Sequence, residues 1–158
     1  MTNSTTFRVL ALPAEALDTI RRTGRDADDH PAEALAAGGG EPLRCCLRDA
    51  EAGEALLLFG YPPPVASGPY REIGPVFAHA TACPGPDAPS VHPPAWRGRP
   101  QVLRAYNRQG RIHGGRLHDG TDPEAVIAEL FGDPAVHQLH SRNVVYGCFM
   151  FAVERADG

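Results

Sequence analysis

The sequence predicts an α+β fold, in which one domain holds a largely antiparallel or mixed sheet with two or three helices packed on it. Three observations favour this class. A chain of 158 residues fits one domain of ordinary size. Segments with the length and composition of strands outnumber segments with helical periodicity. These strands are not separated by the regular helices that a doubly wound parallel sheet requires.

The N-terminal part predicts a tail, a strand and a helix. We expect residues 1–5 to form a disordered tail. Alternating apolar and β-branched residues predict a strand at 6–12. Residues 13–24 begin with proline, end with glycine and carry apolar residues three apart, which predicts a helix. Residues 25–42 predict an irregular connection, in which 31–37 have the composition of two helical turns.

The middle of the chain predicts two buried strands and a long loop. An apolar run at 54–61 has strand length and precedes three prolines, and 74–80 predict another strand. Residues 84–100 hold many prolines, and we expect them to form an irregular surface loop. Both irregular regions belong to the one domain that covers residues 1–158.

The C-terminal part predicts a hairpin, a helix and two more strands. Residues 101–107 and 111–118 flank a turn and predict a β-hairpin. Residues 122–132 begin with a capping aspartate, continue with proline and an apolar stripe, and end with glycine, so they predict a helix. Residues 135–141 and 143–155 predict the last two strands.

Composition argues against several classes of protein. The net charge is −4, whereas a nonspecific nucleic-acid binder needs a basic face. The sequence has neither a signal-peptide pattern nor an apolar run long enough to cross a membrane. We therefore expect a soluble cytoplasmic protein with four reduced cysteines and no nucleic-acid or membrane partner. All fifteen lysine or arginine positions are arginine. Any positively charged side chain of this kind in a binding site is therefore a planar guanidinium, which can donate two parallel hydrogen bonds to a carboxylate or phosphate.

A first candidate site is a metal site formed by Cys46, His79 and Cys83, with Cys45 beside them. Thiolate and imidazole are natural zinc ligands, and four of them close a structural site. Cys45 adjoins Cys46, whereas zinc knuckles usually leave two residues between their cysteines. The predicted zinc ligands are therefore Cys46, His79 and Cys83. The alternatives are buried core cysteines and a strained disulfide between the adjacent pair.

A second candidate site lies near the C-terminus. Alternation along 143–155 predicts that Tyr146, Cys148 and Met150 share one face of a strand. Adjacent antiparallel strands can bring a thiol and an imidazole together, so Cys148 is a candidate nucleophile and His140 its candidate base. The alternative is that Cys148 is a core residue of the last strand.

A third set of residues is suited to an anionic ligand. The guanidinium groups of Arg44 and Arg142 are candidates to bind a carboxylate or phosphate, and Tyr70 and Asn143 are candidate hydrogen-bonding groups. The alternative is that these arginines lie over apolar surface with their charges in solvent.

Several segments can be considered together: PLRCCLRDA at 42–50, GEALLL at 53–58, PYR at 69–71, GPVFAH at 74–79, LFGDP at 130–134 and LHSRNVVYGC at 139–148. Jointly, and in this order, they resemble the bacterial family catalogued as domain of unknown function 1203. The resemblance covers nearly the whole chain, and the family has no assigned activity to transfer.

The resemblance also bears on the candidate sites. Family members often have cysteine at the position of Leu43, and many lack the residues equivalent to His79 and Cys83. A metal site in this chain would therefore be a feature of a subgroup. The residues that do match the family pattern are Arg44, Tyr70, His140, Asn143 and Cys148, which favours a pocket built from them.

Two functions follow from these sites. The preferred one is a small-molecule domain, binding or enzymatic, that holds an anionic ligand in the pocket of Arg44, Arg142, Tyr70 and Asn143, with Cys148 and His140 as candidate catalytic groups. The alternative is a noncatalytic protein-interaction domain stabilised by zinc. The sequence leaves open whether the protein is an enzyme.

Overall fold

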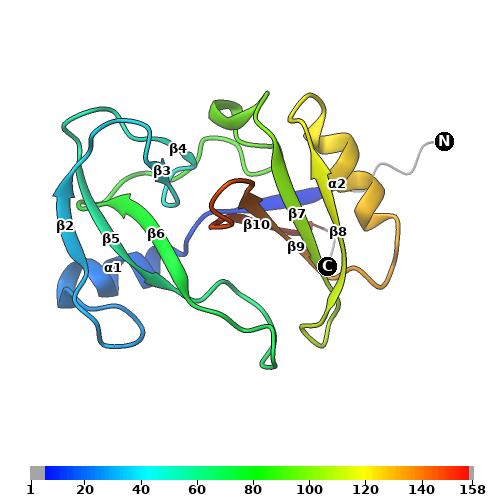
Figure 1. Ribbon diagram of the computed structural model, residues 1–158, viewed down its shortest axis with the longest axis horizontal. Coiled ribbons are helices and arrows are strands. Elements are labelled where there is room, and N and C mark those ends of the chain that lie inside the picture. The colour runs from blue at the N-terminus through cyan, green and yellow to red at the C-terminus, as the bar shows by residue number, and fades with distance from the viewer. Residues whose placement is uncertain (1–5, 157–158) are drawn as a thin grey trace.

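The computed structural model describes residues 6–156, and within this range the chain forms two α-helices, one 3-10 helix and two five-stranded β-sheets (Figure 1). The predicted mixture of helices and strands is therefore present, but the prediction of a single sheet is wrong. The predicted tail at residues 1–5 lies outside the described residues. Neither α-helix in the described part of the chain is long and apolar enough to cross a membrane.

The first sheet is antiparallel throughout and has the strand order β1-β10-β9-β7-β8. Its strands are β1 (Phe7–Leu10), β7 (Gln101–Tyr106), β8 (Ile112–His118), β9 (Gln138–Asn143) and β10 (Phe149–Arg155). Helix α2 (Pro123–Phe131) packs against it through Ile127 and Phe131. Asp122 caps this helix by accepting the N–H of Ala125 over 3.3 Å, so the predicted hairpin, helix and cap are confirmed.

The second sheet is mixed and has the strand order β2-β5-β6-β3-β4. Its strands are β2 (Glu33–Ala36), β3 (Pro42–Leu43), β4 (Arg48–Asp49), β5 (Ala55–Tyr61) and β6 (Gly74–His79). Strand β3 runs parallel to β6, and the other neighbours are antiparallel. Helix α1 (Ala14–Thr23) buries Leu17 and Ile20 against this sheet's core and ends at Gly24, whose φ of 70° suits glycine.

Two regions expected to be irregular contain structure. Residues 33–36 pair with β5 as strand β2, so the expectation of helical turns at 31–37 is wrong. The backbone of β5 offers this segment a full set of interstrand hydrogen bonds, which outweighs its weak local helical preference. Within 84–100, a 3-10 helix, η1 (Pro94–Trp96), places Trp96 in the core, stacked on Phe151 at 6.1 Å between ring centroids.

The predicted strand at 143–155 is wrong in its first part, because residues 144–148 form the turn between β9 and β10. The Asn143 side chain accepts the N–H groups of Val145 and Tyr146, each over 2.9 Å, which stabilises the turn. The side chains of Val145 and Tyr146 are therefore exposed. As a consequence, Tyr146 and Cys148 do not share a strand face with Met150.

Strand β10 belongs to both cores. Its residues Phe151 and Val153 pack in the cluster between the first sheet and α2, whereas Phe149 and Ala152 pack in the cluster between the second sheet and α1. A bulge near its start, between Phe149 and Phe151, interrupts the alternation. The two sheets therefore meet along β10, next to the turn that holds Cys148.

Candidate metal centre

The turn between β3 and β4 brings two adjacent cysteines to one place. Residues 44–47 form a tight turn that the Leu47 N–H closes by donating to the Leu43 carbonyl over 2.9 Å. Leu47 has a φ of 60°, a left-handed conformation that a leucine adopts only when the surrounding structure holds it. In this turn the Sγ atoms of Cys45 and Cys46 lie 3.9 Å apart. No disulfide joins them.

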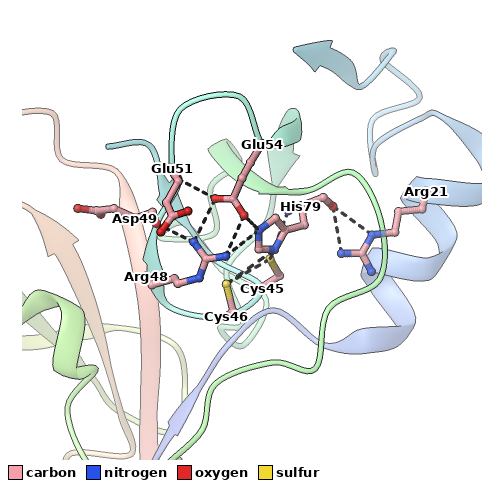
Figure 2. Close-up of polar contacts among 8 residues, drawn as sticks. All are labelled: Arg21, Cys45, Cys46, Arg48, Asp49, Glu51, Glu54 and His79. Atoms are coloured by element: carbon pink, nitrogen blue, oxygen red, sulfur yellow. Dashed lines mark hydrogen bonds and ion pairs between the residues drawn. The ribbon is translucent and has the colours of Figure 1, made fainter. Parts of the chain in front are cut away.

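His79 faces these sulfur atoms from the end of β6 (Figure 2). Because β3 pairs with β6, the turn and the end of β6 are held side by side. The His79 Nδ1 atom lies 3.4 Å from Cys45 Sγ and 3.9 Å from Cys46 Sγ. The backbone N–H of His79 also points at Cys45 Sγ over 3.3 Å.

Cys83 completes the cluster from the loop after β6. One ligand atom from each of Cys45, Cys46, His79 and Cys83 lies within 4.8 Å of all the others. A tetrahedral zinc ion with bonds of about 2.3 Å to sulfur and 2.0 Å to nitrogen places its ligands roughly 3.5–3.8 Å apart. The three predicted metal residues are therefore brought together, and Cys45 is a fourth member of the same cluster.

A shell of charged groups orients the imidazole. His79 Nε2 lies 3.0 Å from Glu54 Oε1, and Arg48 holds the Glu54 carboxylate with two contacts of 2.9 and 3.1 Å (Figure 2). Arg21 of α1 donates to the His79 carbonyl from Nε and Nη2. Arg48, then the Glu51 backbone N–H and His79, keep the pKa of Glu54 well below its usual range. With Glu54 ionised, the His79 tautomer that carries its proton on Nε2 donates to this carboxylate and turns the Nδ1 lone pair to the thiols; the Arg48 Nη2 atom also lies 3.3 Å from Nε2.

The three thiols of the cluster differ in their pKa values. The hydrogen bond from Cys46 lowers the pKa of Cys45 to about 5, and the His79 backbone N–H adds to this effect against the opposing influence of burial. The same hydrogen bond raises the pKa of Cys46, and burial raises that of Cys83. Of the three thiols, Cys45 is therefore the one whose surroundings favour the thiolate, and those of Cys46 and Cys83 favour the protonated form.

The cluster opens on one side to a cleft of about 380 Å³. Cys46, His79 and Cys83 line this cleft, together with prolines of the loop from Pro84 to Pro94. Cys45 lies on the other side of the cluster and is only 3% exposed. An ion could enter from the cleft, whereas the Cys45 thiolate is covered by protein.

A second feature lies where the two sheets meet. Arg44, the residue before Cys45, lines a hollow of about 380 Å³ with Asn143 and Cys148. Arg142 lines an adjoining hollow of about 190 Å³, and Cys148 borders this one too. The structure thus brings four of the predicted pocket residues to one region: Arg44, Arg142, Asn143 and Cys148.

Comparison with protein families matches residues 40–155 to a family described as "Protein of unknown function (DUF1203)". The match spans more than half of the chain. The chain belongs to this family. No curated protein and no solved structure matches the chain. The resemblance noted from the sequence is therefore confirmed, and the DUF1203 segment contains both the cysteine cluster and the Arg44 hollow.

The two other residues predicted for the pocket, His140 and Tyr70, have different surroundings. His140 is 1% exposed, with Nε2 2.9 Å from the Pro64 carbonyl and its ring 4.6 Å from that of Tyr106, and burial lowers its pKa to about 4. The contacts of His140 within the described chain do not include the Cys148 thiol. Tyr70 is 41% exposed and does not line either hollow.

Sequence reasoning missed three contributors to the cluster in this DUF1203 protein. Cys45 is left out of the predicted ligands because adjacent cysteines rarely bind one metal, and the tight turn at 44–47 that brings both to one place has no sequence signal. Glu54 and Arg48 flank the β4–β5 connection, six residues apart, where acidic and basic residues are common. Their link to His79 depends on the pairing of β5 with β6.

Proposed function

We propose that the protein binds one zinc ion through Cys45, Cys46, His79 and Cys83, and that this ion has a structural role. The observation that carries the proposal is the convergence of three thiols and one imidazole nitrogen within 4.8 Å of one another. The ligand atoms of Cys45, Cys46 and His79 lie 3.4–3.9 Å apart, close to the edges of a zinc-centred tetrahedron, and the Cys83 Sγ atom lies within 4.8 Å of each of them.

The ligand set favours zinc over harder cations. Thiolate and imidazole suit zinc, whereas magnesium and calcium take oxygen ligands. The carboxylate behind His79 supports the same reading, since a metal-bound histidine usually donates its other ring N–H to an acceptor such as Glu54. Binding would release the protons of Cys46 and Cys83.

A structural role fits the number and position of the ligands. Four protein ligands fill a tetrahedral zinc and leave no position for water or substrate. The ion would join the β3–β4 turn, the end of β6 and the loop at Cys83, which share few regular hydrogen bonds. Zinc sites of this kind contribute directly to folding free energy.

A reactive thiol is the competing function for this cluster. The low pKa of Cys45 favours it, because a thiolate is the nucleophilic form. Reactive cysteines are partly exposed, however, whereas Cys45 is 3% exposed. We therefore favour metal binding over thiol reactivity as the function of this cluster.

The deciding experiment is elemental analysis of protein purified without a metal-affinity step, with free thiols counted in parallel. We expect about one zinc per chain, and only Cys148 reacting with a thiol reagent until a chelator is added. Cobalt added to the chelator-treated protein should give the visible bands of tetrahedral thiolate coordination.

Matched variants locate the ion. Cys46→Ser and Cys83→Ser should abolish stoichiometric zinc, whereas Cys148→Ser, outside the cluster, should retain it. Absence of bound metal, together with no cobalt spectrum from the wild-type chain, would rule out the proposal even if a ligand variant fails to fold.

A further inference from the structure

The hollows beside Cys148 contain none of the four residues of the cysteine cluster. Both hollows are bordered by Pro75, Tyr146 and Cys148, so they form one region about the β9–β10 turn. Gly147 in this turn has a φ of 76°, and the turn leaves Cys148 partly exposed beside the buried start of β10.

Arg44 places a buried positive charge in the larger hollow. The residue is 2% exposed. Its Nε donates to the Phe149 carbonyl over 2.8 Å and its Nη1 to the Pro42 carbonyl over 2.5 Å. Within the described chain no carboxylate pairs with Arg44, and its Nη2 donates to no protein acceptor. A buried guanidinium is normally paired, because its desolvation is costly.

The other charges around the hollows already have partners. Arg142 is 7% exposed, donates from Nη1 to the Gly147 carbonyl and pairs through Nη2 with Glu72. Each carboxylate that lines the hollows is likewise engaged: Asp49 with Arg99, Glu72 with Arg142, and Glu41 with the backbone N–H groups of Gly38 and Gly39. Arg44 is therefore the one arginine lining these hollows that has no carboxylate partner within the described chain.

We propose that this region binds a small oxyanion, a carboxylate or a phosphate, with Arg44 as its principal partner. The free Nη2 edge of Arg44 is the donor, and the nearby Arg142, whose Nε has no hydrogen-bond partner in the described chain, adds positive potential. The Cys148 thiol lies beside the bound anion. It lines the larger hollow with Arg44 and the smaller one with Arg142.

The rate at which Cys148 is alkylated by charged and neutral reagents reports the electrostatic potential of this region. Iodoacetate and iodoacetamide both alkylate a thiolate with loss of iodide, and only iodoacetate carries a negative charge. Trypsin releases Cys148 in the peptide of residues 143–155, so mass spectrometry can follow its alkylation separately from the other three cysteines. The same peptide from protein alkylated in denaturant gives the reference ratio of the two rates.

We expect the ratio of iodoacetate to iodoacetamide rates at Cys148 to be about tenfold higher in the folded protein than in denaturant, the scale on which a charged cleft concentrates an opposite charge. Inorganic phosphate and succinate are the competing probes. Protection by phosphate alone assigns a phosphate-type ligand, and protection by succinate alone assigns a carboxylate. An unchanged ratio, protection by neither anion, or no alkylation of Cys148 in the folded state would overturn the proposal.

Two variants should change the ratio of iodoacetate to iodoacetamide rates in opposite directions. Arg44→Gln should remove the preference for iodoacetate. Glu72→Gln, at a side chain that is 43% exposed, should increase it by freeing Arg142, and with it Arg104, from their ion pairs with this carboxylate. If Arg44→Gln fails to fold, an unchanged ratio in Glu72→Gln would still count against the proposal. Val145→Ala, an exposed and uncharged neighbour in the turn, is the control and should leave the ratio unchanged.

Discussion

Arg44 donates a hydrogen bond from Nε to the carbonyl oxygen of Phe149 over 2.8 Å, and this contact joins the two sheets. Arg44 belongs to the β3–β4 turn of the second sheet, and Phe149 begins β10 in the first. Burial lowers the pKa of Arg44 to about 10, so the side chain keeps its charge at neutral pH. Hydrogen bonds to a buried charged group are among the stronger polar contacts in proteins.

We predict that Arg44→Met lowers the free energy of unfolding by about 2–4 kcal/mol, because two carbonyls lose a charged donor. Arg44→Lys should recover only part of this loss, since an ammonium group lacks the planar fork. Urea denaturation measures the effect. Arg116→Met, at an exposed ion pair with Glu129, is the control and should change stability by less than about 1 kcal/mol. Equal stability of Arg44→Met and the wild type would contradict this role.

Trp96 and Asp49 form a second link between elements far apart in sequence. Trp96 is fully buried and donates from Nε1 to Asp49 Oδ1 over 2.9 Å. We predict that Asp49→Ala destabilises the protein by about 1–3 kcal/mol because it leaves a buried N–H without an acceptor. Asp49→Asn keeps an acceptor and should lose less. Thermal melting of the two variants gives the comparison, and the idea fails if both lose the same amount.

The carboxylate behind His79 should affect metal affinity, if the cluster holds zinc as proposed. We predict that Glu54→Ala weakens zinc binding by about 10–100-fold, because His79 loses the acceptor that fixes its ring. Competition with a chelator of known affinity measures this change. Glu51→Ala, next to the same arginine but without a contact to His79, should bind zinc like the wild type. Equal losses in the two variants would point to a general charge effect instead.

His92 should make the fold sensitive to acid. It is 1% exposed, neither ring nitrogen has a hydrogen-bond partner in the described chain, and burial lowers its pKa to about 4. An unfolded histidine titrates near 6.5. The unfolded state therefore binds a proton first, and stability falls as the pH drops from about 6.5 to 4.

We predict that His92→Phe, which preserves an aromatic ring against Phe151, reduces this acid-dependent loss by up to roughly 3 kcal/mol. Denaturation at pH 7 and pH 4.5 measures the difference, and the exposed His30→Gln serves as control. The other buried histidines continue to contribute in both proteins. A pH profile identical to that of the wild type would show that His92 is not buried in its neutral form.

Local sequence signals predicted much of the fold. Helix α2 has a capping aspartate, a proline and an apolar stripe, and each acts within a few residues. The β7–β8 hairpin is equally local. The division into two sheets was not predictable in this way, because it depends on β10 contacting both cores and on β3 pairing with β6. Strands of two residues, such as β3 and β4, are too short to show any periodicity.

The candidate sites, like the fold, could be predicted from the sequence only where the signal is local. The types of ligand at the cluster were predictable because thiols and imidazole are few in the chain. The place of Cys45 in the cluster was not, since the tight turn at 44–47 that brings both cysteines to His79 has no sequence signal. For the hollows beside Cys148, the sequence identified Arg44 and Arg142 but not the acidic residues around them, nor the turn at 144–148 that separates Cys148 from the strand it was expected to join.

Arg44 and Cys45 are joined by one peptide bond, yet their side chains belong to different sites: one lies in the hollow between the sheets and the other in the cysteine cluster. A ligand on either side restricts the same four-residue turn. If both sites bind as proposed, the first ligand would reduce the conformational entropy that the second must remove, and the two occupancies would be thermodynamically linked without any change in the mean structure. By the reciprocity of such linkage, a ligand at either site would change the affinity of the other site by the same factor.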